Sequence, residues 1–420
     1  HGPLRPLRAA AAGVAAPRRR GRQEGGGAQR GGLPGGAADG GAGPLEHRLG
    51  GAEGAGEVVA EDHRQREVVD AGAAAGPSLG TAAEHYEQAG DAANAAEFYA
   101  QAAERAASTY ANEAVLDYVA RSLKLATADA WALRRRLHAA RESTLDLLGR
   151  REAQREDIAA LQELADACSD EGMRADVALR HALFALRTGD YDTTDMQARH
   201  AAARATQAGH EELALLAANP LAVAMAYRGN PGGGRTIADA ALARAQALGL
   251  PFAQGKLANA AAICAASQRD WSAGLRYQAL NLSSSRSRGD RRGEAMALGN
   301  LGVLAVCLGD LDTSRRHLLE ALRLNRLQGS RPAEGINLTY LSEIAWRCGD
   351  DAQALAEAEA AVAILTEVRA PLYLSEALRA LGNAELALGR PAASAAAFER
   401  SEAAARATGN ASRVLEALEA

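Results

Sequence analysis

The residues that come nearest to a phosphate-binding loop lie at positions 249–257. Such a loop wraps phosphates with backbone amides, places a lysine on them, and uses a following Ser or Thr to bind Mg²⁺. Here Gly249 and Gly255-Lys256 are one residue too far apart, and Leu257 cannot ligate Mg²⁺. No Gly-x-Gly-x-x-Gly follows a strand pattern, because no strands are predicted. We therefore predict no nucleotide or other cofactor site.

Histidines and carboxylates are the next candidates for chemistry. His210-Glu211-Glu212 lacks the second histidine of a zinc-protease helix, and His181 and His200 belong to different predicted helices. The carboxylates fall on exposed helical faces with arginines nearby, whereas acid–base catalysis needs a sheltered pair with separated pKa values. We predict no catalytic and no metal-binding residues, and we expect that the protein is not an enzyme.

The composition favours helices packed on small side chains. Hydrophobic residues make up 48% of the chain and aromatic residues only 4%, so Ala, Leu and Val dominate. Ala and Leu favour helices, whereas strands favour β-branched and aromatic residues. The net charge of -5 argues against nucleic acid as a partner. Only Lys124 and Lys256 are lysines, beside 45 arginines, which we interpret as a coding bias.

Cysteine use and hydropathy favour the cytoplasm. The four cysteines stand singly, so they form neither a disulfide framework nor a zinc motif, and we expect them to be buried: Cys168, Cys264, Cys307 and Cys348. No apolar run reaches the length of about 18 residues that a membrane helix needs. We therefore predict a cytoplasmic protein without membrane contact.

Residues 1–76 differ from the rest of the chain. They contain 19 of the 43 glycines and show no apolar periodicity. Such a segment cannot offset its ordering entropy by burial, which predicts disorder. A second interpretation is out-of-frame translation, because the change to a helical pattern near Ser78 is abrupt. Peptides from residues 20–70 in a digest of the native protein would exclude that interpretation.

A 40-residue period governs the remaining sequence. One series of positions reads Gly149, Gly189, Gly229, Arg269, Gly309, Gly349 and Gly389, and a second series halfway between reads Ser169, Gly209, Gly249, Gly289, Gly329, Arg369 and Gly409. After the first series, most copies continue with an acid or amide: Asp190, Asn230, Asp270, Asp310 and Asp350. Glycine ends a helix in the left-handed conformation, and Asp or Asn caps the next helix. The pattern predicts antiparallel pairs of helices of about 14–17 residues, given the spacing of the turns.

The most regular copies resemble the tetratricopeptide repeat (TPR) in a 40-residue form. The matching residues are Leu301-Gly302, Gly309-Asp310, Ser314, Leu318 and Ala321, then Leu341-Ser342, Gly349-Asp350, Ala354 and Ala361, then Leu381-Gly382, Gly389, Ser394, Phe398 and Ser401. The usual aromatic positions of the first helix hold other residues, such as Leu298, Ala305 and Glu385. The resemblance implies an all-α, right-handed superhelical solenoid of antiparallel helix pairs behind a low-complexity N-terminal segment.

A separate copy covers residues 82–106, with Gly90-Asp91, Ala95, Tyr99 and Ala102. This order of segments is similar to the C-terminal TPR array of large bacterial signal-transduction ATPases, of the cyclase-linked or transcription-regulator type, and it implies an ATPase domain upstream. We divide the chain into a low-complexity segment (1–76), degenerate TPR-like helix pairs (77–126) and a solenoid of about seven units (127–420).

The resemblance also implies a concave groove lined by the first helix of each unit, which would hold a peptide or protein. Its register selects eight candidate protein-binding residues: Asn219, Asn259, Thr339, Glu343, Trp346, Arg347, Arg379 and Asn383. We interpret the chain as a non-catalytic interaction scaffold, the sensory or regulatory array of a larger bacterial signalling ATPase. A free-standing TPR adaptor is the first alternative, and an enzyme with an unrecognised site in 77–170 is the second.

Overall fold

The computed structural model describes residues 78–407, with the side chains of 371 and 372 excepted, and every regular element in this part of the chain is an α-helix. The predictions for residues 1–76, for Gly409 and for the end of the chain lie outside the described residues. The helices are α3 (Leu79–Gln88), α4 (Ala92–Ser108), α5 (Asn112–Leu125), α6 (Trp131–Leu148), α7 (Arg151–Cys168), α8 (Glu171–Thr188), α9 (Tyr191–Gln207), α10 (Glu211–Leu216), α11 (Ala218–Tyr227), α12 (Pro231–Ala247), α13 (Pro251–Ser267), α14 (Trp271–Ser287), α15 (Arg291–Leu308), α16 (Leu311–Gln328), α17 (Arg331–Cys348), α18 (Asp351–Glu367), α19 (Pro371–Ala387) and α20 (Pro391–Ala407).

Two or three residues connect most consecutive helices. After α15, Gly309 takes a left-handed φ of 80°, its N–H donates to the Val306 carbonyl at 3.0 Å, and the N–H of Asp310 donates to the Ala305 carbonyl at 3.0 Å. This is the Schellman arrangement of a helix C-terminus. The Asp310 carboxylate then accepts from the Thr313 N–H at 3.1 Å and caps α16. Because the turns are this short, the helices reach 17 or 18 residues in most pairs, slightly longer than the sequence predicts.

The positions without glycine keep the same backbone. Ser169, Arg269 and Arg369 have φ values of 52°, 61° and 50°. A left-handed conformation costs a side-chain-bearing residue about 1–2 kcal/mol. The neighbouring helix pairs therefore impose the turn even where the residue disfavours it.

Close approach holds the two helices of a pair together. A Cβ on Gly302 of α15 would lie 2.6 Å from Leu318 Cγ of α16, and the Ser314 hydroxyl donates to the Gly302 carbonyl at 2.8 Å. Ser394 makes the same bond to Gly382, also at 2.8 Å. Small residues at these positions let the helix backbones approach each other, as the TPR pattern requires.

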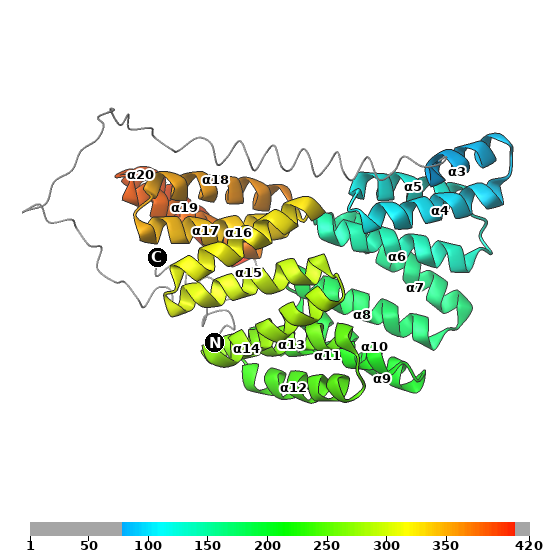
Figure 1. The fold of residues 1–420 in the computed structure, drawn as a ribbon, viewed down its shortest axis with the longest axis horizontal. Helices are drawn as coiled ribbons and strands as arrows, with labels where there is room; N and C mark the ends of the chain where they lie inside the picture. The colour runs from blue at the N-terminus through cyan, green and yellow to red at the C-terminus, as the bar shows by residue number, and fades with distance from the viewer. Residues whose placement is uncertain (1–77, 408–420) are drawn as a thin grey trace, which may run out of the picture. The chain divides into compact units, whose positions relative to one another are not determined.

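Consecutive helices lie side by side and alternate in direction (Figure 1). Helix α6 packs on α7, α8 on α9, and the order continues to α19 on α20. The third of these pairs is irregular, because Pro220 has no N–H to bond the Leu216 carbonyl, and the first helix divides into α10 and α11 there. The fold is an all-α solenoid of TPR type.

Helices far apart in sequence also touch. Helix α6 contacts α17, the Asn112 side chain of α5 donates to the Gln328 carbonyl at 2.8 Å, and Arg369 pairs with Glu152 of α7 at 2.7 Å. Helices α5–α7 therefore pack on the segment that runs from α15 to the start of α19. In a simple solenoid each repeat would touch only its neighbours.

Candidate functional site

The eight candidate residues lie on the first helices of their pairs, on α11, α13, α17 and α19, and we call them the first-helix surface. Three are buried, with 8%, 4% and 8% of their surface exposed: Asn259, Thr339 and Glu343. The other five are partly exposed: Asn219, Trp346, Arg347, Arg379 and Asn383.

Glu343 organises the α17–α19 part of this surface. Arg347 Nη2 donates to Glu343 Oε1 at 2.7 Å, and Arg379 Nη2 of α19 lies 4.0 Å from Glu343 Oε2. The Arg347 guanidinium also donates to the Val306 carbonyl of α15 at 3.5 Å. A buried carboxylate thus positions two arginines, with Trp346 adjacent in sequence.

Asn259 makes hydrogen bonds to two other helices. Its side-chain oxygen accepts from Gln278 Nε2 at 3.0 Å and from Asn300 Nδ2 at 2.9 Å, so it connects α13 to α14 and α15. The Thr339 hydroxyl donates to the Gly335 carbonyl within its own helix at 3.0 Å. Asn259 and Thr339 already form hydrogen bonds inside the chain. The part-exposed candidate residues are therefore more available for contact with a ligand.

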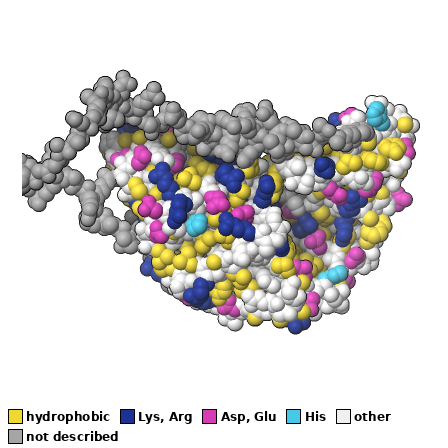
Figure 2. All heavy atoms as spheres, viewed as in Figure 1, with side chains coloured by type: hydrophobic (Ala, Val, Ile, Leu, Met, Phe, Trp, Pro, Cys, Tyr) yellow, Lys and Arg dark blue, Asp and Glu magenta, His cyan; other side chains and the backbone are white. Residues whose placement is uncertain are grey.

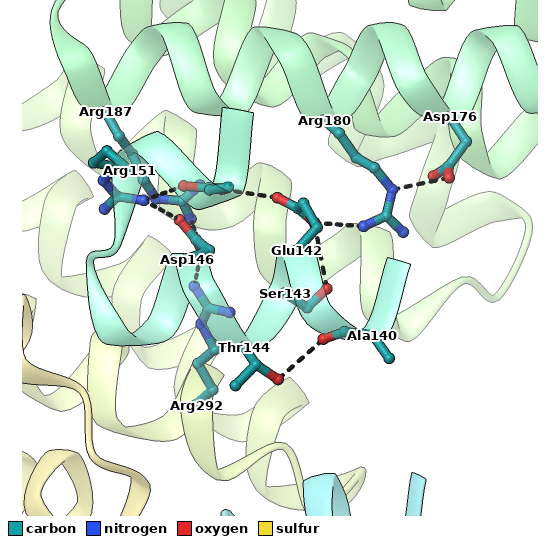
Figure 3. Close-up of polar contacts among 11 residues, drawn as sticks. Ala140, Glu142, Ser143, Thr144, Asp146, Arg151, Asp176, Arg180, Arg187 and Arg292 are labelled. Carbon is teal, nitrogen blue, oxygen red and sulfur yellow. Dashed lines mark hydrogen bonds and ion pairs between the residues drawn. The ribbon is translucent and has the colours of Figure 1, made fainter. Parts of the chain in front are cut away.

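A second charged group, which sequence reasoning missed, surrounds Asp146 at the end of α6. Its carboxylate pairs with Arg151 of α7 at 2.7 Å, with Arg187 of α8 at 3.1 Å, and with Arg292 of α15. Figure 3 shows the three guanidinium groups pointing toward this carboxylate from different helices. Burial would raise the pKa of Asp146, but Arg187, Arg292 and Arg151 together hold it well below its usual range.

Lys256 of α13 lies close to the same arginines. Its pKa is lowered to about 8, mainly by burial and in addition by Arg292, Arg187 and Arg288, while Asp290 acts in the opposite direction. Its ammonium group lies 5.4 Å from the centre of the Phe252 ring. We call Asp146, Arg151, Arg187, Lys256 and Arg292 the basic cluster.

Paired charges flank the basic cluster. Glu142 accepts from Arg180 at 2.6 Å and from the buried Gln154 amide at 2.7 Å, and Arg180 also pairs with Asp176 at 2.9 Å. Asp290 pairs with Arg288 at 3.0 Å. The basic cluster and its flanking pairs together contain six basic and four acidic side chains, an excess of two positive charges. The basic side chains are Arg151, Arg180, Arg187, Lys256, Arg288 and Arg292, and the acidic ones are Glu142, Asp146, Asp176 and Asp290.

Two features contain residue types that also occur in active sites: the pair of His138 and Asp157, and Ser78. His138 Nδ1 lies 2.7 Å from Asp157 Oδ1, but Asp157 is fully buried between α6 and α7 and is also bound by Arg141 at 2.7 Å. The sequence Gly76-Pro77-Ser78-Leu79-Gly80 has the spacing of a hydrolase nucleophile motif. Ser78 immediately precedes α3, and the strand that a nucleophile elbow needs before its serine would fall outside the described residues.

Two of the four cysteines are buried. Cys264 and Cys307 are buried, and burial raises the pKa of both thiols to about 12, which makes them unreactive. The expectation of burial is wrong for Cys348, which is exposed because it immediately precedes the turn at Gly349, and Cys168 is only partly buried. Between residues 78 and 407, no group of three or more His, Cys, Asp or Glu side chains is placed to hold a metal ion.

The exposed charges are mixed in sign. On the face shown in Figure 2, basic and acidic side chains alternate over the described helices without a broad patch of one sign. Among the described helices, none combines the length and the apolar character that crossing a bilayer requires.

No protein-family model matches the chain, and no curated protein matches it. Solved structures do. A Rap protein in complex with the competence and sporulation factor aligns with a TM-score of 0.52 and 11% identity, over 77% of this chain and 95% of that one. A signal transduction ATPase with numerous domains and a tetratricopeptide repeat sensor, from Pyrococcus horikoshii, gives 0.48 and 14%, over 73% and 51%. Aspartyl phosphate phosphatase F from Bacillus subtilis gives 0.48 and 13%, over 70% and 74%.

At these identities the likeness concerns the fold alone, and the alignment with the Rap protein supports a helical repeat fold of TPR type. The chain spans about half the length of the Pyrococcus ATPase chain.

Proposed function

We propose that this protein is a non-catalytic interaction scaffold that binds a peptide or protein segment along the first-helix surface. The observation that carries the proposal is the group on α17 and α19, where buried Glu343 pairs with Arg347 at 2.7 Å and lies 4.0 Å from Arg379. Trp346, which precedes Arg347 on α17, is part-exposed. Trp and Arg are the residues that most often anchor a protein ligand. The two positioned guanidinium groups suit an acidic side chain of a bound segment, and Trp346 suits an apolar one.

The geometry of the repeats supports an extended ligand. Asn219 and Asn383 are part-exposed residues of first helices that are four helix pairs apart, on α11 and α19. Asparagine amides can bond the backbone of an extended peptide, as in other backbone-recognition modes. The Rap protein with the same type of fold was solved with the competence and sporulation factor bound, which is consistent with a peptide or protein ligand.

A selection from phage-displayed random peptides tests the proposal, followed by fluorescence polarisation of the selected peptides with the full chain. We expect Trp346→Ala and Asn383→Ala each to weaken binding about 10-fold or more, the range of a central interface residue. Arg199→Ala and Arg316→Ala are matched controls, because both residues are exposed on second helices, α9 and α16. Binding that depends on the controls and not on the first-helix variants would overturn the proposal.

We further propose that the array is the sensory or regulatory part of a larger cytoplasmic bacterial signalling ATPase. The similarity of the segment order to such arrays supports this, and the alternative is a free-standing adaptor. Sequencing the gene upstream in all three frames distinguishes them. A P-loop and an ATPase core in any frame would support the ATPase assignment, and a start codon close to the array would support the adaptor. An enzyme with a site in 77–170 is the weakest alternative, because the His138–Asp157 pair there is enclosed by its own helices.

A further inference from the structure

The basic cluster has more positive charge than its own carboxylate can neutralise. Three guanidinium groups share the two oxygens of Asp146. A guanidinium carries five N–H donors, so most of the donors in this group must find partners elsewhere. No carboxylate of the described residues pairs with Lys256 at salt-bridge distance, although Arg187 and Arg292 are close by.

The electrostatics agree with this charge imbalance. The pKa of Arg187 is lowered by burial and by Arg292 and Arg151, even though Asp146 acts in the opposite direction. The arginine thus experiences more repulsion and desolvation than Asp146 compensates. An additional anion placed among these side chains would relieve both effects.

The cations remain accessible while their carboxylate is not. The Asp146 side chain is 6% exposed, whereas the Arg187 and Arg292 side chains are 36% and 41% exposed. Burial is the largest influence on the pKa of both arginines; the pKa of Arg187 is lowered, whereas Asp146 and other carboxylates raise that of Arg292. Part of each arginine side chain is open to solvent, on α8 and on α15. A ligand could reach these side chains from solvent without displacing the buried carboxylate.

We propose that Arg187, Lys256 and Arg292 form a binding site for the carboxylates of an acidic peptide segment in a partner protein. The arginines offer planar forks that match a carboxylate, and Lys256 offers a third cation beside them. This inference rests on the proposed scaffold function, and it specifies the chemical class of the partner. It also gives the basic cluster a role separate from that of the Glu343 group on α17 and α19.

A fluorescein-labelled hexaglutamate peptide is the probe, and its binding to the full chain at low salt is measured by fluorescence polarisation. We expect Arg187→Gln/Lys256→Gln to weaken binding at least 10-fold, because two of the three cations lose their charge. The control Arg199→Gln/Arg316→Gln removes the same two charges from exposed positions on α9 and α16, and we expect a change of less than 2-fold. Equal losses in both double variants would show nonspecific charge attraction and would overturn the proposal.

Folding and ligand class are controlled separately. Circular dichroism shows whether the loss of Arg187 unfolds the chain. If it does, Lys256→Gln alone still tests the proposal, because it removes no ion pair of the described residues. A single-stranded DNA oligonucleotide that binds more tightly than hexaglutamate, with the same dependence on Lys256, would also overturn the proposal. If selected peptides bind in a Trp346-dependent manner and hexaglutamate does not bind, only this site is wrong. If neither binds, the scaffold proposal is wrong as well.

Discussion

Lys256 is one of two lysines in a chain with 45 arginines, and the fold places it among three of those arginines. Its charge faces Arg187 on α8, Arg292 on α15, and Arg288 and Asp290 in the turn between α14 and α15. In the sequence, Lys256 is notable only as the lysine of an incomplete phosphate-binding loop pattern. Its electrostatic environment arises from helices that lie 30 to 70 positions away along the chain, so no local motif could have revealed it.

The depressed pKa of Lys256 predicts a pH-dependent stability. The folded-state value of about 8 lies below the usual 10.5, so between these pH values the unfolded chain binds more protons than the folded chain. The free energy of unfolding contributed by this group should therefore rise as the pH increases from about 8 to about 10.5, and be lowest below pH 8. Urea unfolding at pH 7.5, 8.5 and 9.5 measures the effect.

Two variants separate the contribution of Lys256 to this pH dependence from that of other groups. Lys256→Met should lose this rise, whereas Lys124→Met, which changes the exposed second lysine on α5, should keep it. Identical pH profiles of Lys256→Met and the unchanged protein would contradict the assignment.

At the scale of the helix pair, the small residues of the first helix decide the packing distance. Gly302 and Ser314 bring α15 and α16 together, and Gly382 repeats the contact against Phe398, whose ring would lie 2.7 Å from an added Cβ. The repeating sequence identified the small residues at these positions, because the period fixes which residues of the two helices meet. It did not predict the break between α10 and α11, which depends on a single proline.

Gly302→Ala should destabilise the protein by about 1–3 kcal/mol, because the methyl group would overlap Leu318 and force the helices apart. Gly232→Ala is the matched control on α12, where the nearest atom lies 3.5 Å from an added Cβ. There the gain in helix propensity should make the change neutral or stabilising by up to about 1 kcal/mol. Free energies of unfolding from urea titrations report both values. A smaller loss for Gly302→Ala than for Gly232→Ala would refute the packing argument.

At the scale of the whole described region, the contacts between α5–α7 and α15–α19 couple repeats that a linear array would leave independent. Asp146 and Arg292 are 146 positions apart, and Asn112 bonds a carbonyl 216 positions away. In a one-dimensional array local opening spreads only to neighbours, whereas these contacts connect two distant groups of helices.

Arg292→Gln should therefore raise amide hydrogen exchange in α6 and α15 together, although the substitution lies only in α15. Arg286→Gln is the control, because Arg286 pairs only with Glu294 and Glu320 of the next two helices. It should change exchange in α14–α16 and leave α6 as it was. Hydrogen exchange is measured by mass spectrometry of peptides from both regions. If Arg292→Gln left the exchange of α6 unchanged, the coupling would be contradicted.

The sequence by itself determined most of the turns and the pairing of neighbouring helices. These features depend on contacts within about 40 residues, and each is specified by a local signal such as Gly309 followed by Asp310. It also placed Glu343 on the same helix face as Arg347, one turn away. The tertiary structure alone decided that Asn259 and Glu343 are buried and that Asp146, Arg187, Lys256 and Arg292 converge. Small rotations between successive helix pairs accumulate along the array, and this sum, which no single repeat encodes, brings α6 to α15 and creates the basic cluster.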